Sequence, residues 1–217
     1  MKIIITGATG MVGSEVVRQA ILDDAITEIT AIVRKPLSIS HPKLKIVLHQ
    51  NFLDYTALSE TFKANDACLW CLGISQTQVN KEEYHTITYD YCVAAADAML
   101  KVNPAINFIF LSGAGADSEE KSRTLFARVK GKTENALQKL PFKKLYIARP
   151  AAIRPIAKRE KAPLFEKILR PLFPIFQLII PSQIITSVDL AKALLHLAKK
   201  GADKIILESA ELKNLIQ

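Results

Sequence analysis

The sequence of 217 residues predicts an α/β fold: a doubly wound parallel sheet with a small C-terminal, substrate-side lobe. Apolar, β-branched runs alternate along the chain with segments of helical periodicity. A glycine-rich loop at residues 7–13 stands between the first strand and the first helix. The length and a hydrophobic fraction of 49% fit one domain with a large core. We therefore predict a single domain over 1–217.

The first strand and the first helix are the clearest elements. Residues 2–6 form a short β-branched run, and residues 11–22 place Val16 and Ala20 on one face of a helix. The apolar run at 67–72 is typical of a parallel strand covered on both faces. The other predicted strands are 26–33, 44–48, 106–111, 144–148 and 204–207, and the other predicted helices are 55–62, 82–102, 123–140 and 188–199. Right-handed crossovers bring the carboxyl ends of such strands to one edge, where ligands bind.

Residues 150–187 differ in character from the rest of the chain. Six prolines fall between Pro150 and Pro181, which disfavours long regular helices. Residues 154–181 carry six Lys or Arg against two Glu, interspersed with apolar side chains. Such a segment fits a substrate lid, a dimer surface, a patch on a membrane or a small hydrophobic lobe on the sheet edge. We predict a proline-broken substrate-side or interaction lobe here.

The glycine loop is the strongest signal in the sequence. Gly7 permits a tight turn, Gly10 lets the backbone approach a pyrophosphate, and Gly13 lets the helix pack closely. The helix N-terminus adds unpaired N–H donors for phosphates. No Gly-Lys-Ser/Thr ends the motif, which excludes a Walker-type loop. The sequence thus predicts a Rossmann-type dinucleotide site whose loop contacts come from Gly7, Thr9, Gly10, Met11, Val12 and Gly13.

The end of the second strand favours NADP(H) over NAD(H). Sites that prefer NAD usually place an acid there to bond the ribose hydroxyls. Here the strand ends in Val33, followed by Arg34 and Lys35. A planar, multidentate guanidinium suits a 2′-phosphate, and Lys35 adds charge. The alternative is a pair of ordinary solvated surface cations.

Five segments, taken in order, resemble the atypical short-chain dehydrogenase/reductase superfamily, especially its Tat-interacting-protein-like oxidoreductase branch. The resemblance covers about residues 1–155 and rests on 7–13, 31–34, 71–73, 111–117 and 129–134. It implies an NADP(H) pocket that adds three features to the glycine loop. They are Arg34, the Asn51-Phe52 turn beside the adenine, and Leu72-Gly73 at the end of the fourth strand.

The catalytic pattern of that superfamily is broken in this chain. Its reductases use a tyrosine four residues before a lysine, which lowers the tyrosine pKa and holds the nicotinamide ribose. The lysine matches Lys130, but Phe126 replaces the tyrosine and has no exchangeable proton. The companion serine often lies where this chain has Gly113, one position after Ser112. Ser112 and Lys130 remain the catalytic candidates, and Lys130 can also serve purely as a ribose ligand.

Two functions fit this combination. The first is an oxidoreductase that acts on a small carbonyl or alcohol and takes its proton from Ser112, water or the substrate. The second is an inactive NADPH-binding regulatory protein that acts through a protein partner. The possible substitutes for the tyrosine are Tyr84, His85, Tyr89 and Tyr91, but helix-surface or partly buried roles fit these side chains better.

Bulk composition narrows the partners further. The net charge is +8, yet no Lys/Arg block is interleaved with aromatics, so nucleic acid is not expected. Three cysteines with no secretory leader favour a reducing compartment, and we expect a cytoplasmic monomer or homodimer. Cys68 and Cys71 lack a second Cys/His pair, so no metal is expected. No apolar stretch reaches 18 residues, so a spanning helix is not predicted.

Overall fold

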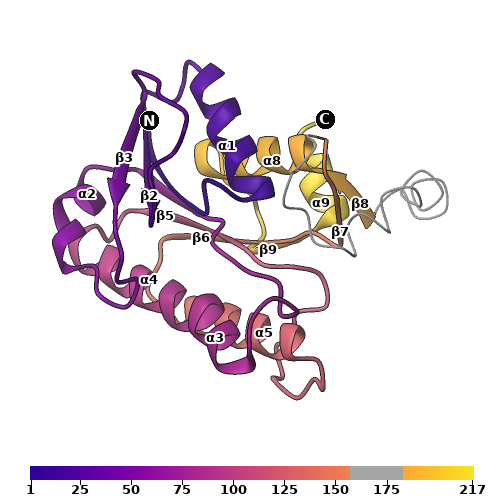
Figure 1. The fold of residues 1–217 in the computed structure, drawn as a ribbon. Helices are drawn as coiled ribbons and strands as arrows, with labels where there is room; N and C mark the ends of the chain where they lie inside the picture. Colours follow the sequence, from indigo (N-terminus) through magenta and orange to yellow (C-terminus); the bar gives the residue numbers. More distant parts are fainter. Residues whose placement is uncertain (157–182) are drawn as a thin grey trace.

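The computed structural model describes residues 1–156 and 183–217 and centres on a seven-stranded parallel sheet (Figure 1). The strand order is β3-β2-β1-β4-β5-β6-β9, and every neighbouring pair is parallel. The strands are β1 (Lys2–Thr6), β2 (Glu28–Val33), β3 (Leu44–Leu48), β4 (Ala67–Trp70), β5 (Asn107–Leu111), β6 (Lys144–Arg149) and β9 (Ile206–Glu208). This order reverses between β1 and β4, which is the switch point where such sheets bind ligands.

Helices cover both faces of the sheet (Figure 1). One layer contains α1 (Met11–Leu22) and α8 (Ser187–Lys199), and the other contains α4 (Tyr91–Val102) and α5 (Leu125–Lys139). Two hydrophobic cores result, because alternate strand residues face opposite layers. In β1, for example, Ile3 and Ile5 belong to the first core and Ile4 to the second. The predicted doubly wound fold is confirmed.

The predicted helix over 82–102 is present but is not regular throughout. It runs as α3 (Lys81–His85), a π-helical turn η2 (Thr86–Asp90) and α4. The predicted helix over 55–62 is likewise divided into a 3-10 turn, η1 (Thr56–Leu58), and α2 (Ser59–Lys63). Periodicity identifies such helices but does not resolve a change of winding inside them.

Three short elements near the C-terminus are not among those predicted from the sequence. β7 (Ala152–Arg154) and β8 (Ile184–Thr186) pair in parallel as a separate two-stranded sheet, and α9 (Ser209–Asn214) follows β9. The two short strands frame residues 157–182, which lie outside the described residues. The predictions for the basic, proline-rich segment therefore fall almost wholly outside them. The last strand begins at Ile206 rather than at the predicted residue 204.

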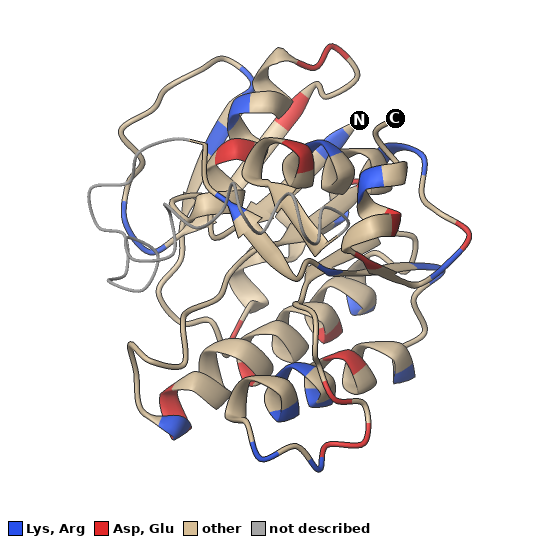
Figure 2. Cartoon of the chain, turned by 90° about the vertical axis from the view of Figure 1, so that its right-hand side faces the viewer, with Lys and Arg blue, Asp and Glu red and all other residues tan. Residues whose placement is uncertain are grey.

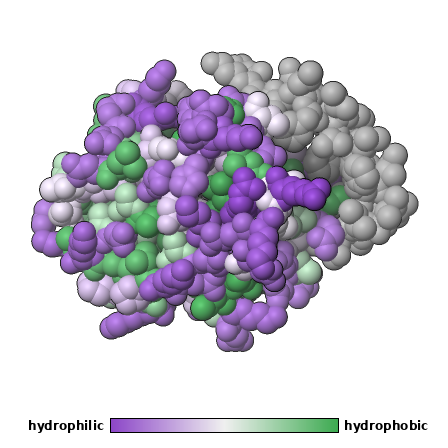
Figure 3. Space-filling view, turned by 90° about the horizontal axis from the view of Figure 1, so that it is seen from below, coloured by the Kyte–Doolittle hydropathy of each residue, from purple (hydrophilic) through white to green (hydrophobic). Residues whose placement is uncertain are grey.

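Charged and apolar side chains are mixed over the surface. Figure 2 shows basic and acidic residues on both helical layers rather than one sign on each. Seen from the side of α3, α4 and α5, hydrophobic patches alternate with hydrophilic side chains (Figure 3). In the part of the chain that the structure describes, every helix is too short or too polar to span a bilayer.

Candidate functional site

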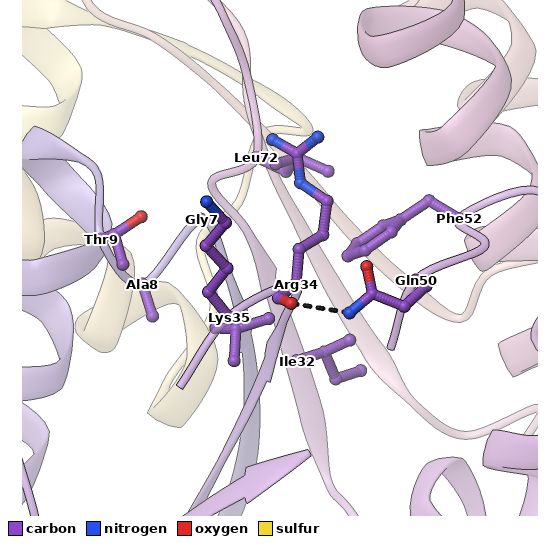
Figure 4. Close-up of a pocket in the computed structure, with 10 residues that line it drawn as sticks. Gly7, Ala8, Thr9, Ile32, Arg34, Lys35, Gln50, Phe52 and Leu72 are labelled. Atoms are coloured by element: carbon purple, nitrogen blue, oxygen red, sulfur yellow. Dashed lines mark hydrogen bonds between the residues drawn. The ribbon is translucent and has the colours of Figure 1, made fainter. Parts of the chain in front are cut away.

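A cleft of about 540 Å³ opens at the carboxyl ends of β1 and β2 (Figure 4). Its size lies within the range of small-molecule sites, roughly 300–1,000 Å³. Its walls combine the glycine loop, the chain after β2 and the chain after β3. The lining residues are Gly7, Ala8, Thr9, Ile32, Val33, Arg34, Lys35, Gln50, Phe52 and Leu72. The structure therefore brings together the glycine loop and the two cations, which are far apart in the sequence.

Gly7, Gly10 and Gly13 differ in how strongly the geometry of the loop requires a glycine. Gly7 has a φ of +66°, and a Cβ on it would lie 2.4 Å from the carbonyl oxygen of Cys71. A Cβ on Gly13 would lie 2.2 Å from the carbonyl oxygen of Gly7. The close packing predicted for Gly13 is thus between α1 and the loop itself. A Cβ on Gly10 would meet only that same oxygen, at 3.1 Å, so the fold needs this glycine least.

The N-terminus of α1 faces the loop with free donors. Gly10 is its N-cap and provides no side-chain cap, so the first N–H groups, including those of Met11 and Val12, have no side-chain acceptor from it. The Gly10 N–H itself donates to Gly7 O at 2.8 Å and closes the turn. Thr9, Gly10 and Met11 also line a smaller adjoining cavity of about 90 Å³. This arrangement fits a phosphate group.

Arg34 and Lys35 are exposed and follow directly after β2. Figure 4 shows Arg34 extending between Leu72 and Phe52, and Lys35 extending toward the glycine loop. Neither side chain has an acidic partner among the residues that the structure describes, and no acid lines this cleft. Two cations without local counter-charges at the end of the second strand suit an anionic ligand group.

The far wall of the cleft is apolar. Phe52 is buried, and its ring centroid lies 5.4 Å from that of His49 and 5.6 Å from that of Tyr91. Asn51, predicted to lie beside the adenine, does not line the cleft, because its carboxamide oxygen accepts the Leu53 N–H at 3.1 Å. Gln50 lines it instead, a residue that sequence reasoning missed. Gly73 is exposed, and a Cβ on it would meet nothing within 4 Å.

Lys130 lies on α5, buried beneath the end of β5. Its Nζ donates to Leu111 O at 2.9 Å and lies 4.6 Å from the centre of the Phe110 ring. Burial lowers the pKa of Lys130 to about 8, although the negative groups around it, Glu134 among them, act in the opposite direction. Lys130 does not line the cleft, so the structure does not unite it with the glycine loop.

The side chain of Ser112 is already engaged in a hydrogen bond within the protein. Its hydroxyl donates to a carboxylate oxygen of Glu134, which is completely buried. Glu134 is also bound by the guanidinium of Arg149, whose Nε lies 3.1 and 3.0 Å from the two carboxylate oxygens. The hydroxyl proton of Ser112 is therefore held by a structural ion pair. This weakens the prediction that Ser112 donates a proton to a substrate.

Phe126 lies where a serine at position 113 would have to fit. A Cβ on Gly113 would lie 2.7 Å from Cζ of Phe126. The main-chain N–H of Phe126 donates to the side-chain oxygen of Gln76, at 2.8 Å, so the loop after β4 closes over the start of α5. The chain thus lacks both hydroxyls of the expected pattern, and the ring fills the space between the two positions.

The aromatic and histidine candidates of the α3–η2 region lie outside the cleft. Tyr84 is buried, and desolvation raises its pKa. His85 lies between Asp90, at 3.2 Å, and Lys132 Nζ, at 3.1 Å. Tyr89 lies against His85 and beneath Lys132. Tyr91 contacts Phe52 behind the apolar wall. None of the four replaces the missing tyrosine.

A parallel sheet in this order, with a glycine loop at its switch point, defines a NAD(P)-binding Rossmann protein. The family model described as NAD(P)H-binding matches residues 7–153. The chain belongs to this family, and it is a member of the atypical short-chain dehydrogenase/reductase superfamily.

Three related proteins support that assignment. Protein HTATIP2 of Rattus norvegicus is 25% identical over 79% of this chain and 70% of its own length. Leucinostatins biosynthesis cluster protein T of Purpureocillium lilacinum is 30% identical over 70% of this chain and 65% of its own length. The mitochondrial protein FMP52 of Chaetomium globosum is 25% identical over 98% of this chain and 95% of its own. The resemblance inferred from the sequence is confirmed, while the cytoplasmic location stays a prediction.

Solved structures agree with the fold. WbmG of Bordetella bronchiseptica in complex with NAD superposes with a TM-score of 0.71 at 13% identity, covering 96% of this chain and 72% of that one. A UDP-N-acetylglucosamine 4-epimerase from Bacillus cereus gives 0.69 at 20% identity, covering 99% and 83%. At such identities the likeness concerns the fold alone.

Proposed function

We propose that the chain binds NADP(H) in the cleft and is an oxidoreductase of the short-chain dehydrogenase/reductase type that acts on a small carbonyl or alcohol. One observation carries the cofactor preference. Arg34 and Lys35 line the cleft where an NAD-preferring site has an acid, and neither has an acidic partner among the described residues.

Different residues of the cleft would bind different parts of the coenzyme. The N–H groups at the start of α1 would receive the pyrophosphate, and Arg34 with Lys35 would receive the 2′-phosphate. Phe52, Ile32 and Leu72 offer apolar surface for the adenine. Gly7 and Gly13 keep the loop in the shape that allows this approach. The cofactor fits this donor set.

The cofactor, when bound, supplies or accepts the hydride. The chain would position the substrate and exclude water. Lys130, the ribose ligand that the family resemblance implies, would have to leave Leu111 O to reach the nicotinamide ribose. The usual tyrosine is replaced by Phe126, and the Ser112 hydroxyl is engaged by Glu134. The proton would therefore come from water or from the substrate itself rather than from either side chain.

A second candidate function is an NADPH-responsive binding protein without turnover, which acts through a protein partner. The contact between Phe126 and position 113 favours it, because the ring fills the space where the hydroxyls would work. Bound cofactor would then shift the population of one surface conformation by its differential affinity.

Calorimetry with NADPH and NADH tests the cofactor proposal. We expect NADPH to bind more tightly, and Arg34→Asp to move the preference toward NADH, because an acid there repels the 2′-phosphate and accepts from ribose hydroxyls. Arg123→Asp, at an exposed position outside the cleft, is the matched control. Unchanged selectivity in Arg34→Asp would refute the assignment of Arg34.

Turnover separates the two functions. Purified protein with NADPH and a panel of small aldehydes and ketones is followed through nicotinamide absorbance. Loss of absorbance with any member supports the oxidoreductase. Tight NADPH binding with a flat trace across the panel supports the binding protein.

A further inference from the structure

The chain after β2 is held to the chain after β3 by one side chain. The last main-chain hydrogen bond between the two strands runs from the His49 N–H to Val33 O, at 2.9 Å. One residue further along each strand, the carboxamide nitrogen of Gln50 donates to Arg34 O at 2.7 Å. Figure 4 shows this bond among the side chains that line the cleft. Gln50 thus continues the attachment beyond the end of the regular pairing.

This bond acts where the chain has few other restraints. Arg34 and Lys35 form an exposed bend followed by Pro36, outside any strand or helix. The main chain of Arg34 sets the direction in which its side chain leaves the backbone, because the Cα–Cβ bond is fixed by the main-chain conformation. By fixing the Arg34 carbonyl, Gln50 favours the orientation in which the guanidinium lies between Leu72 and Phe52.

The neutral carboxamide is also the right chemical group for this position. Its nitrogen must face the Arg34 carbonyl, since two carbonyl oxygens cannot share a hydrogen bond. Its oxygen then lies on the Phe52 side of the cleft (Figure 4). A carboxylate here could not donate to Arg34 O, and it would compete with a bound phosphate for the guanidinium.

We propose that Gln50 is a positioning residue for coenzyme selectivity, which holds Arg34 in place to receive the 2′-phosphate of NADP(H). The proposal rests on the NADP(H) function proposed above. It assigns Gln50 an effect on the affinity for NADPH and none of comparable size on the affinity for NADH. Gln50 acts through Arg34, so its contribution disappears when Arg34 is removed.

A double-mutant cycle tests this. Gln50→Met keeps the length of the side chain and removes the donor. We expect it to weaken NADPH binding by about three- to tenfold, as the loss of one hydrogen bond implies, and to change NADH binding less than twofold. Gln50→Glu should weaken NADPH binding further. In the Arg34→Ala background, Gln50→Met should have no additional effect on either coenzyme. Gln138→Met, at an exposed position on α5, is the matched control.

Two kinds of result would contradict these proposals. If Gln50→Met weakens NADPH and NADH equally, or if its effect adds fully to that of Arg34→Ala, Gln50 does not act through Arg34. Thermal unfolding of each variant shows whether such an equal loss comes from damage to the fold. If the unaltered protein binds NADPH no better than NADH, the proposed NADP(H) function fails, and the role of Gln50 fails with it.

Discussion

The glycines of the nucleotide loop can be separated by what a methyl group would meet. At Gly13 the new Cβ would lie 2.2 Å from a main-chain oxygen of the same loop, which cannot move away without opening the turn. At Gly10 the nearest atom is at 3.1 Å. Gly13 is therefore required by the fold, whereas the absence of a side chain at Gly10 serves the approach of a ligand.

We expect Gly13→Ala to lower the free energy of unfolding by about 1–3 kcal/mol, the usual cost of overpacking. Gly10→Ala should leave the unfolding free energy within about 1 kcal/mol of the original and weaken NADPH binding, because its methyl group occupies the approach to the pyrophosphate. Urea unfolding and calorimetry measure the two effects. Equal stability losses in both variants would contradict this division.

The buried amine of Lys130 makes stability depend on pH. Its pKa is lowered by burial from 10.5 to about 8, so between these values the unfolded chain binds more protons than the folded one. The stabilising contribution is therefore complete above about pH 10.5 and is lost as the pH falls through 8. A shift of this size corresponds to about 3 kcal/mol.

Lys130→Met should remove this dependence. We expect the free energy of unfolding of the unaltered protein, measured relative to Lys130→Met, to rise as the pH increases from 8 to 10.5. Taking the difference cancels the thiols and phenols that Lys130 does not influence, while Cys71 and Cys92, whose pKa values burial raises and the charge of Lys130 lowers by a smaller amount, remain coupled to it. A difference that is flat or falls with pH would show that Lys130 is not buried as a cation of lowered pKa.

At the level of single residues, the sequence identified the glycine loop, Arg34 and Lys35 because their positions follow from the topology. Phe52 and Leu72 were identified through the family resemblance instead. It did not identify Gln50, whose role depends on a bond across 16 residues of sequence. Nor could it show that Glu134, paired with Arg149, accepts from the Ser112 hydroxyl, since a buried ion pair between α5 and β6 leaves no local pattern.

At the level of elements, β5 and α8 are joined by a buried side chain. The carboxamide nitrogen of Asn107, at the start of β5, donates to Leu197 O at 3.0 Å and to Ala198 O at 3.2 Å. These carbonyls belong to the last turn of α8, where helices run out of intrahelical donors. Asn107 thus fastens the end of α8 to the start of β5.

Asn107→Ala should lower the free energy of unfolding by about 1–3 kcal/mol, because the buried Leu197 and Ala198 carbonyls both lose the Asn107 amide and only Leu197 O keeps a main-chain donor, Gly201 N–H. Asn214→Ala, at an exposed position in α9, is the control and should change it by less than about 0.5 kcal/mol. Denaturation in urea measures both. A loss no larger than that of the control would mean that water replaces the Asn107 amide.

The long elements were predictable and the short ones were not. Strands such as β1 and helices such as α1 carry enough apolar positions for their period to be read. β7 and β8 have three residues each, and their pairing joins segments 30 residues apart. The π-helical turn within the helix after β4 changes the hydrogen bonding without altering the apolar pattern.

At the level of the whole molecule, the fold could be predicted because the alternation of strands and helices leaves few topologies for a chain of this length. The chemistry could not be predicted to the same depth. Phe126 removes the expected proton donor, and only the structure shows that its ring also fills the space at Gly113. What remains of the family pattern is the coenzyme site, so a proton for catalysis has to come from a group other than Phe126.

The net charge of +8 adds a long-range contribution to coenzyme selectivity. A 2′-phosphate brings about 1.5–2 additional negative charges, and the Debye length falls from about 30 Å at 0.01 M salt to about 10 Å at 0.1 M. We expect the preference for NADPH over NADH to fall several-fold as KCl is raised from about 20 to 500 mM. Arg34→Asp lowers the net charge by two and removes the local contact. Any dependence of the coenzyme preference on salt concentration that remains in this variant therefore measures the field of the remaining cations. A preference that does not change with salt in the unaltered protein would mean that shape, and not charge, distinguishes the two coenzymes.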